Sequence, residues 1–152
     1  LSAVAKILNH QHGLPVKFYF TLTDKEWSNY QHEFGDFGET VGELKVYECP
    51  SFYKKMDGII FPSLLECFSA TPLECLLMEK PLFASDRGFV RDVCGDHAFY
   101  FDPLIPDSIA TAIFEYFQGI QKTDIELDDS KSHVINFSNA KQRTIDYLSI
   151  VI

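Results

Sequence analysis

The sequence lacks the features that mark membrane, secreted and nucleic-acid-binding proteins. No apolar run approaches the roughly 20 residues that a membrane-spanning helix requires. Residues 1–13 show no basic start followed by an apolar block, the pattern of a secretory signal. Lysine and arginine number 13 against 22 acidic residues, which leaves a net charge of −9. Because nucleic acids and anionic membranes attract clustered basic residues, neither is the expected partner.

Cysteine and histidine are too few and too scattered to indicate a disulfide framework or a metal site. The cysteines form no C-x-x-C pair; they are Cys49, Cys67, Cys75 and Cys94. A chain of 152 residues can bury a core without disulfides. The five histidines show no ligand spacing. We therefore expect reduced thiols, no metal and a cytoplasmic protein, with the inner face of the membrane as an alternative location for the full-length protein.

Apolar and aromatic side chains, by contrast, are plentiful. They include 14 phenylalanines, and 46% of the residues are hydrophobic. This composition and length predict one globular domain over residues 1–152, with a thick core. Because the chain starts at Leu1 and its only methionines are Met56 and Met78, we expect this domain to be a fragment of a longer, two-domain protein.

Short apolar runs alternate with helical patterns along the chain. Strands are expected at Val16–Leu22, Glu39–Val41, Gly58–Pro62, Pro81–Ser85 and Ala98–Asp102. Helices are expected near residues 1–12, 24–34, 48–56, 72–79, 89–93, 109–117 and 138–151, with Asp24 capping the second. Strands that are apolar throughout are typical of a parallel sheet covered on both faces. The pattern predicts an α/β fold with a Rossmann-like doubly wound parallel sheet, in which ligands bind beyond the carboxyl ends of the strands.

The segment after the Gly58–Pro62 strand carries the residues suited to a ligand. It places Glu66 in a loop and Glu74 in the first turn of the next helix, with the small residues Ser69–Thr71 between them. Unpaired N–H groups at a helix start favour an anion, and small side chains let a phosphate approach. Carboxylates would repel that phosphate, so we expect the two glutamates to accept hydrogen bonds from hydroxyls on either side of it, as in a nucleotide sugar.

Residues 56–103 resemble the C-terminal, donor-binding domain of retaining GT-B glycosyltransferases of the group 1 type, family four. In that family two glutamates are separated by seven residues, as Glu66 and Glu74 are here. The resemblance extends over about Val16 to Phe117 and includes Tyr53. The other matching positions are Asp57, Pro62, Ser63, Phe68, Pro72, Pro81, Gly95, Asp96 and Pro103.

The resemblance implies a role for each residue of the segment. Glu66 would contact the donor sugar and support the transition state as the catalytic residue, and Glu74 would bind the ribose hydroxyls. The backbone of Phe68, Ser69, Ala70 and Thr71 would hold the diphosphate and the sugar. No metal would be used, because N–H groups and basic side chains would stabilise the leaving diphosphate. Three positions depart from the family pattern. Ser69 and Lys80 stand where glycine is usual, and Cys75 is a mild change from the small residue that usually follows the second glutamate.

The family's first strand and its basic loop have no counterpart in this chain, so we expect an open edge or slot in the sheet. The implied reaction transfers a sugar from a nucleotide-diphosphate sugar to a saccharide or lipid-linked acceptor with retention of configuration, commonly in polysaccharide biosynthesis. The acceptor would bind the absent N-terminal domain, so the fragment alone is expected to be inactive. The alternatives are a glycosidase with Glu66 and Glu74 as its acid/base pair and a non-catalytic nucleotide-binding or interaction domain.

Several other side chains have two interpretations at this stage. Cys67 and Cys75 could be nucleophiles, but without a neighbouring histidine we expect them to pack in the core. Asp86, Arg87 and Asp92 follow a strand end and either touch ligand or form surface salt bridges.

Overall fold

The computed structural model describes residues 1–67, 69–120, 130 and 132–134, in five strands and seven α-helices. The strands are β1 (Phe18–Phe20), β2 (Gly38–Thr40), β3 (Ile59–Phe61), β4 (Leu82–Ser85) and β5 (Phe99–Phe101). The helices are α1 (Ser2–Lys6), α2 (Asp24–Trp27), α3 (Gln31–Phe34), α4 (Cys49–Lys55), α5 (Thr71–Leu77), α6 (Gly88–Cys94) and α7 (Pro106–Phe117). A π-helical turn, Ile7–Gln11, continues α1, and 3₁₀ turns lie at Gly35–Phe37 and Val46–Glu48. The helix expected over residues 138–151, most of the polar segment 122–131 and Phe68 lie outside the described residues.

The described strands form two parallel groups. β1 pairs with β2, with Tyr19 opposite Glu39. β4 lies between β3 and β5, with Phe83 opposite both Ile60 and Phe99. Both groups follow the expected alternation of strands and helices, so the prediction of an α/β fold with parallel strands is confirmed.

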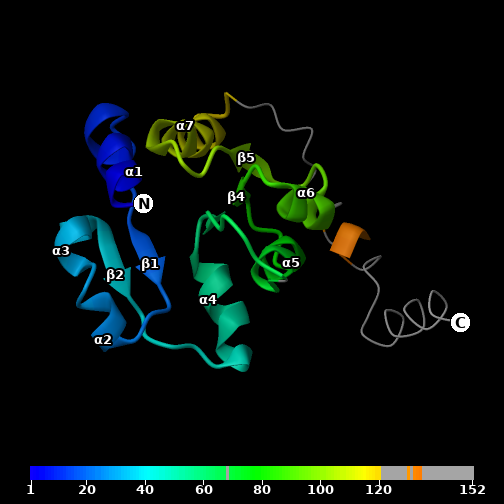
Figure 1. Cartoon of the computed structure of the whole chain (residues 1–152), viewed down its shortest axis with the longest axis horizontal. Helices are drawn as coiled ribbons and strands as arrows, with labels where there is room; N and C mark the ends of the chain where they lie inside the picture. The colour runs from blue at the N-terminus through cyan, green and yellow to red at the C-terminus, as the bar shows by residue number, and fades with distance from the viewer. Residues whose placement is uncertain (68, 121–129, 131, 135–152) are drawn as a thin grey trace, which may run out of the picture.

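The three-stranded group separates two hydrophobic cores. On one face, Ile59 and Leu82 pack with residues of α4, α5 and α6. On the other, Phe83 and Phe99 pack with residues of α1 and α7, which lie next to each other in Figure 1. Strand residues alternate between the two cores because successive side chains point to opposite faces. Helices on both faces explain why these strands are apolar throughout.

The β1–β2 pair is covered less completely than the sequence suggests. Phe20 packs against Trp27 and Phe34, with ring centroids 5.2 and 4.9 Å away. Tyr19 points to the opposite face, where 41% of its surface is exposed. The prediction that Val16–Leu22 is covered on both faces was therefore wrong, because an apolar run does not reveal whether helices are available for each side.

The helix expected over residues 24–34 is divided, and its cap is one residue earlier than expected. Thr23, not Asp24, is the N-cap of α2, and its hydroxyl accepts a hydrogen bond from the Glu26 N–H while the Glu26 carboxylate accepts one from the Thr23 N–H. The helix ends at Trp27 because the Ser28 side chain bonds back to the Lys25 carbonyl. Such local side-chain bonds compete with helix continuation.

The end of α5 also differs from the expected alignment. Glu79, not Lys80, has the left-handed backbone that favours glycine, with φ of 52°. Lys80 instead extends its ammonium group to the carbonyls of Lys54 and Met56, at 3.1 and 2.7 Å. Lys80 thereby provides donors for the exposed carbonyls at the C-terminus of α4.

Candidate functional site

A cavity of about 1010 Å³ lies between β1 and β3. Its walls include every residue of β1 together with Ile59 and Ile60 of β3. Helices close both faces: Leu8 and Ile113 line the cavity from one core, and Tyr53 lines it from the other. We call this cavity the β1–β3 slot.

The carboxyl ends of β1 and β3 open onto residues of the expected ligand-binding segment. Thr71 and Glu74, at the start of α5, line the slot at this end. The Tyr53 hydroxyl, on α4, donates a hydrogen bond to Glu74 Oε2 at 2.9 Å. Burial is the main cause that raises the pKa of the Tyr53 phenol, and the adjacent Glu74 carboxylate raises that pKa further. The phenol therefore stays protonated and holds Glu74 through one oxygen.

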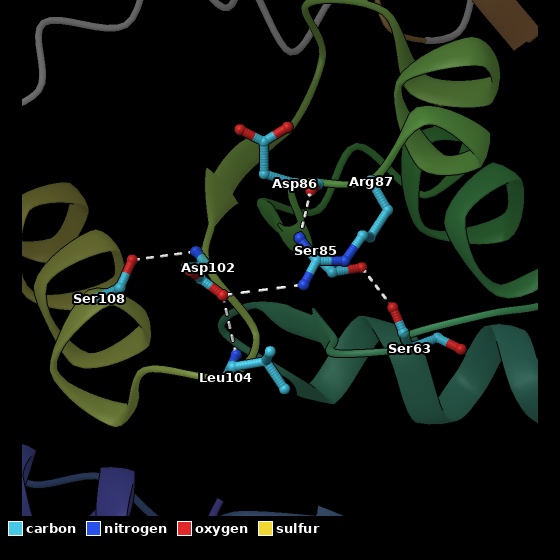
Figure 2. A network of polar contacts seen from close by, with 7 residues as sticks. All are labelled: Ser63, Ser85, Asp86, Arg87, Asp102, Leu104 and Ser108. Atoms are coloured by element: carbon cyan, nitrogen blue, oxygen red, sulfur yellow. Dashed lines mark hydrogen bonds and ion pairs between the residues drawn. The ribbon is translucent and has the colours of Figure 1, made fainter.

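The loop that carries Glu66 is fixed at its start by a buried serine. Ser85, fully buried at the end of β4, donates its hydroxyl to the Ser63 carbonyl at 2.6 Å. Figure 2 shows this bond joining the carboxyl ends of β3 and β4. Glu66 itself is half-buried and makes no hydrogen bond or ion pair to another described residue. Its carboxylate is therefore free of described protein partners while its loop is anchored.

Charged side chains next to this anchor pair with one another. Arg87 lies 3.8 Å from Asp102 Oδ1, and the same carboxylate oxygen accepts the Leu104 N–H at 3.0 Å (Figure 2). Arg91 pairs with Asp86 and lies 4.0 Å from the centroid of the Tyr100 ring. Of the two interpretations for Asp86 and Arg87, the structure supports salt bridges.

The structure brings only part of the expected donor site into the slot wall. Glu74 and Thr71 belong to it, whereas Glu66, Ser69 and Ala70 lie in the preceding loop outside its lining. Their roles, and that of Phe68, which lies outside the described residues, stay predictions. Ala70 is the N-cap of α5 and has no side chain that could accept the first N–H groups of the helix.

The cysteines differ in their environment. All four are free, Cys75 and Cys94 are fully buried, and burial raises the pKa of each of these two thiols to about 12. The prediction of core packing holds for Cys75, which also bonds the Lys80 carbonyl at 3.2 Å. It was wrong for Cys67, which is exposed.

The described residues contain neither a metal-binding cluster nor a membrane-spanning helix. No group of three or more histidine, cysteine, aspartate and glutamate side chains in this part of the chain could hold a metal ion. No helix there combines the length and the apolar character needed to cross a bilayer.

Comparison with solved structures identifies the class of fold. A glycosyltransferase from Rickettsia africae ESF-5 superposes over 97% of this chain and 42% of its own, with a TM-score of 0.75 and 18% identity. The pneumococcal O-GlcNAc transferase GtfA, in complex with UDP and GlcNAc, superposes over 99% of this chain and 31% of its own, with a TM-score of 0.66 and 16% identity. Sucrose-phosphate synthase from Thermosynechococcus elongatus superposes over 84% of this chain and 33% of its own, with a TM-score of 0.66 and 16% identity. The fold is therefore the Rossmann-like α/β domain of GT-B glycosyltransferases.

These similarities are structural. The chain spans about a third to two fifths of the length of these neighbours. No protein-family model matches it, and no curated protein matches it in sequence.

Sequence reasoning did not identify the two residues that hold the site together. Tyr53 matches the family pattern without an assigned role, although its spacing from Cys49 and Met56 places all three on one helix face. Ser85 is the last residue of an otherwise apolar strand, and a lone buried hydroxyl at a strand end was the available signal. Neither pairing could be read from the sequence, because the partners are 21 and 22 residues away.

Proposed function

We propose that the chain is the donor-binding domain of a metal-independent, retaining GT-B glycosyltransferase. The full protein would transfer a sugar from a nucleotide-diphosphate sugar to a saccharide or lipid-linked acceptor. The observation that carries this proposal is the Glu74 carboxylate, held by Tyr53 on the wall of the β1–β3 slot at the carboxyl ends of parallel strands. Ligands of doubly wound folds bind at such positions.

The proposed roles follow from the chemistry of each group. Glu74, with one oxygen held by Tyr53, has a second oxygen to accept hydrogen bonds from ribose hydroxyls. Glu66, anchored through the Ser63–Ser85 bond, would accept from the donor sugar and stabilise positive charge that develops at its anomeric carbon. The backbone N–H groups between Phe68 and Thr71 would hold the diphosphate. The complex of the similar GtfA with UDP and GlcNAc supports this class of ligand.

Titration calorimetry with UDP, GDP and ADP in the presence of EDTA tests the proposal. We expect one of the three to bind and Glu74→Gln to weaken its binding at least about tenfold, since a hydrogen bond to a charged group is worth about 1.5–3 kcal/mol. Asp107→Asn is the matched control, because Asp107 also lies in the first turn of a helix. Equal losses of binding in the two variants would mean that removing any helix-start carboxylate weakens binding, and that Glu74 makes no specific contact with the nucleotide. Binding that requires a divalent metal would contradict the metal-independent class.

A further inference from the structure

Lys80 connects the turn after α5 to the end of α4. Its ammonium group donates hydrogen bonds to the carbonyls of Lys54 and Met56, at 3.1 and 2.7 Å. These carbonyls belong to the last turn of α4 and to its C-cap, where a helix leaves carbonyls without partners of its own. The salt bridges among the described residues do not include Lys80. The ammonium group therefore serves the backbone of α4 and not a carboxylate.

The backbone of Lys80 is itself fixed to α5. Its N–H donates to the Cys75 carbonyl at 3.2 Å, and its carbonyl accepts a hydrogen bond from the Cys75 thiol, also at 3.2 Å. Cys75 is fully buried in a close-packed core, so it provides a rigid point of attachment. The side chain of Lys80 therefore bridges a fixed position on α5 to the C-terminus of α4.

The Tyr53–Glu74 bond is a second link between the same two helices, which lie next to each other in Figure 1. Tyr53 directly precedes Lys54, and its carbonyl accepts the Met56 N–H at 3.1 Å. Lys80 thus holds the backbone immediately after Tyr53. Because α4 has only seven residues, it depends on tertiary contacts for its position. The position of the Tyr53 hydroxyl depends on the same contacts.

Lys80 does not itself line the β1–β3 slot, whereas Tyr53 and Glu74 do. Any effect of Lys80 on a ligand in the slot would therefore pass through α4. The family that the sequence resembles usually has glycine at this position, and glycine has no side chain to make the contact. The link through Lys80 is thus a feature of this chain.

We propose that Lys80 is a positioning residue of the candidate donor site. By fixing the C-terminus of α4, it holds the Tyr53 hydroxyl on one oxygen of Glu74 and leaves the other oxygen available to the ligand. This inference rests on the proposed function, in which Glu74 binds ribose hydroxyls. Without the ammonium group, α4 shifts more easily relative to α5, and the Tyr53–Glu74 bond loosens although both residues are present.

Exchange of the Tyr53 hydroxyl proton with water tests this link without any nucleotide. NMR of tyrosine labelled at Cζ follows the exchange, and Tyr53→Phe assigns the signal. We expect Lys80→Met to speed the exchange at least about tenfold, because each opening of the bond exposes the proton to water. Lys80→Arg retains donors for the two carbonyls and should restore most of the slow exchange. The matched control, Lys54→Met, removes an exposed charge from the same end of α4 and should leave the exchange unchanged.

The Phe83 amide separates local loosening from a general loss of stability. Phe83 lies in the central strand β4, so its amide exchanges through global unfolding. In Lys80→Met we expect its exchange to change less than that of the Tyr53 hydroxyl. Equal acceleration of the two would overturn the proposal, because Lys80 would then only stabilise the fold. Unchanged exchange of the Tyr53 proton would overturn it as well.

Calorimetry with whichever of UDP, GDP and ADP binds extends the test to the ligand. Lys80→Met should weaken binding about threefold to tenfold, as expected for the loss of one hydrogen bond. If Lys80 acts through Tyr53, the double variant with Tyr53→Phe should bind no more weakly than Tyr53→Phe alone. Losses that add would overturn the proposal, because Lys80 would then act by a route that does not include Tyr53. Binding of none of the three by the unmodified chain would contradict the proposed function, whereas hydroxyl exchange still decides whether Lys80 positions Tyr53.

Discussion

Tyr53 and Tyr100 are two phenols with different partners, and the comparison isolates what Tyr53 does. Burial is the main cause that raises the pKa of both phenols. Tyr53 donates to the Glu74 carboxylate, whereas Tyr100 donates to the Gly95 carbonyl at 2.6 Å. Both hydroxyls fix local structure, but only that of Tyr53 contacts a residue of the candidate site.

Tyr53→Phe should therefore weaken nucleotide diphosphate binding about threefold to tenfold, since a lost hydrogen bond costs about 0.5–1.5 kcal/mol. Tyr100→Phe should lower the free energy of unfolding by about 0.5–1.5 kcal/mol and leave nucleotide binding unchanged. Calorimetry measures the first quantity and urea unfolding the second. Equal effects of the two substitutions on binding would show that Tyr53 acts through stability alone.

Thiol reactivity at the residue scale should follow burial. In the native protein at pH 8, a disulfide reagent should modify the exposed Cys67 first and leave Cys75 and Cys94 unmodified until the chain unfolds. The buried pair have a pKa of about 12, so about one in ten thousand of these thiols is ionised at pH 8. The absorbance of the released reagent thiol gives the time course of modification, and peptide mass mapping identifies the order in which the cysteines react. Early modification of Cys75 would contradict the described packing.

The same raised pKa values predict how stability depends on pH. A thiol with a folded pKa above its unfolded value of about 8.5 stabilises the folded state fully below that value. This contribution is lost as the pH rises toward 12. The free energy of unfolding should therefore fall above about pH 8.5, and Cys94→Ala should make the fall less steep. Urea unfolding of both proteins at several pH values above about 8.5 measures this pH dependence of the free energy of unfolding.

At the scale of elements, the turn after α5 stores backbone strain. Glu79 has φ of 52°, a conformation that costs a residue with a Cβ about 1 kcal/mol relative to glycine. It sits where α5 ends and Lys80 begins its contacts with the C-terminus of α4. The turn thus joins two helices that carry site residues.

Glu79→Gly should unfold with a free energy about 1 kcal/mol higher than that of Glu79→Ala, as measured by urea denaturation. Both substitutions remove the carboxylate, so its interactions do not contribute to the difference between the two variants. That difference reports the cost of the left-handed backbone conformation at residue 79. An alanine variant as stable as the glycine variant would show that residue 79 is not held in the left-handed region in solution.

At the scale of the whole molecule, the two groups of strands differ in burial. Every residue of β4 is buried and both of its edges are paired, whereas the described residues of β1 and β2 are half-buried or exposed. Regions with fewer buried apolar contacts open at lower free energy. The β1–β2 pair should therefore open without unfolding the rest.

Native-state hydrogen exchange should show amides of β4 exchanging only through global unfolding. The bonded amides of β1 and β2, including Val41, should exchange through a smaller opening. Low concentrations of urea should lower the opening free energy of β4 with the full slope of global unfolding, whereas that of the β1 and β2 amides should fall less steeply, because a smaller opening exposes less surface. Identical opening free energies for Phe83 and Val41 would mean that the two groups unfold as one unit.

The sequence by itself determined the alternation of strands and helices, the parallel fold and the position of Glu74 in the first turn of a helix. These follow from local patterns: apolar runs of strand length, the Pro72 signal at the helix start and the spacing of the two glutamates. Its errors were also local in origin. Val16–Leu22 looks buried on both sides because a run of apolar residues carries no information about which faces are covered.

Only the tertiary structure decided which groups meet. The Tyr53–Glu74 and Ser63–Ser85 bonds join residues 21 and 22 positions apart, and the β1–β3 slot joins strands about 40 residues apart. Such pairings depend on sheet order and on which face each helix covers. The sequence pattern fixes neither, because the same strands and helices can be arranged in more than one order.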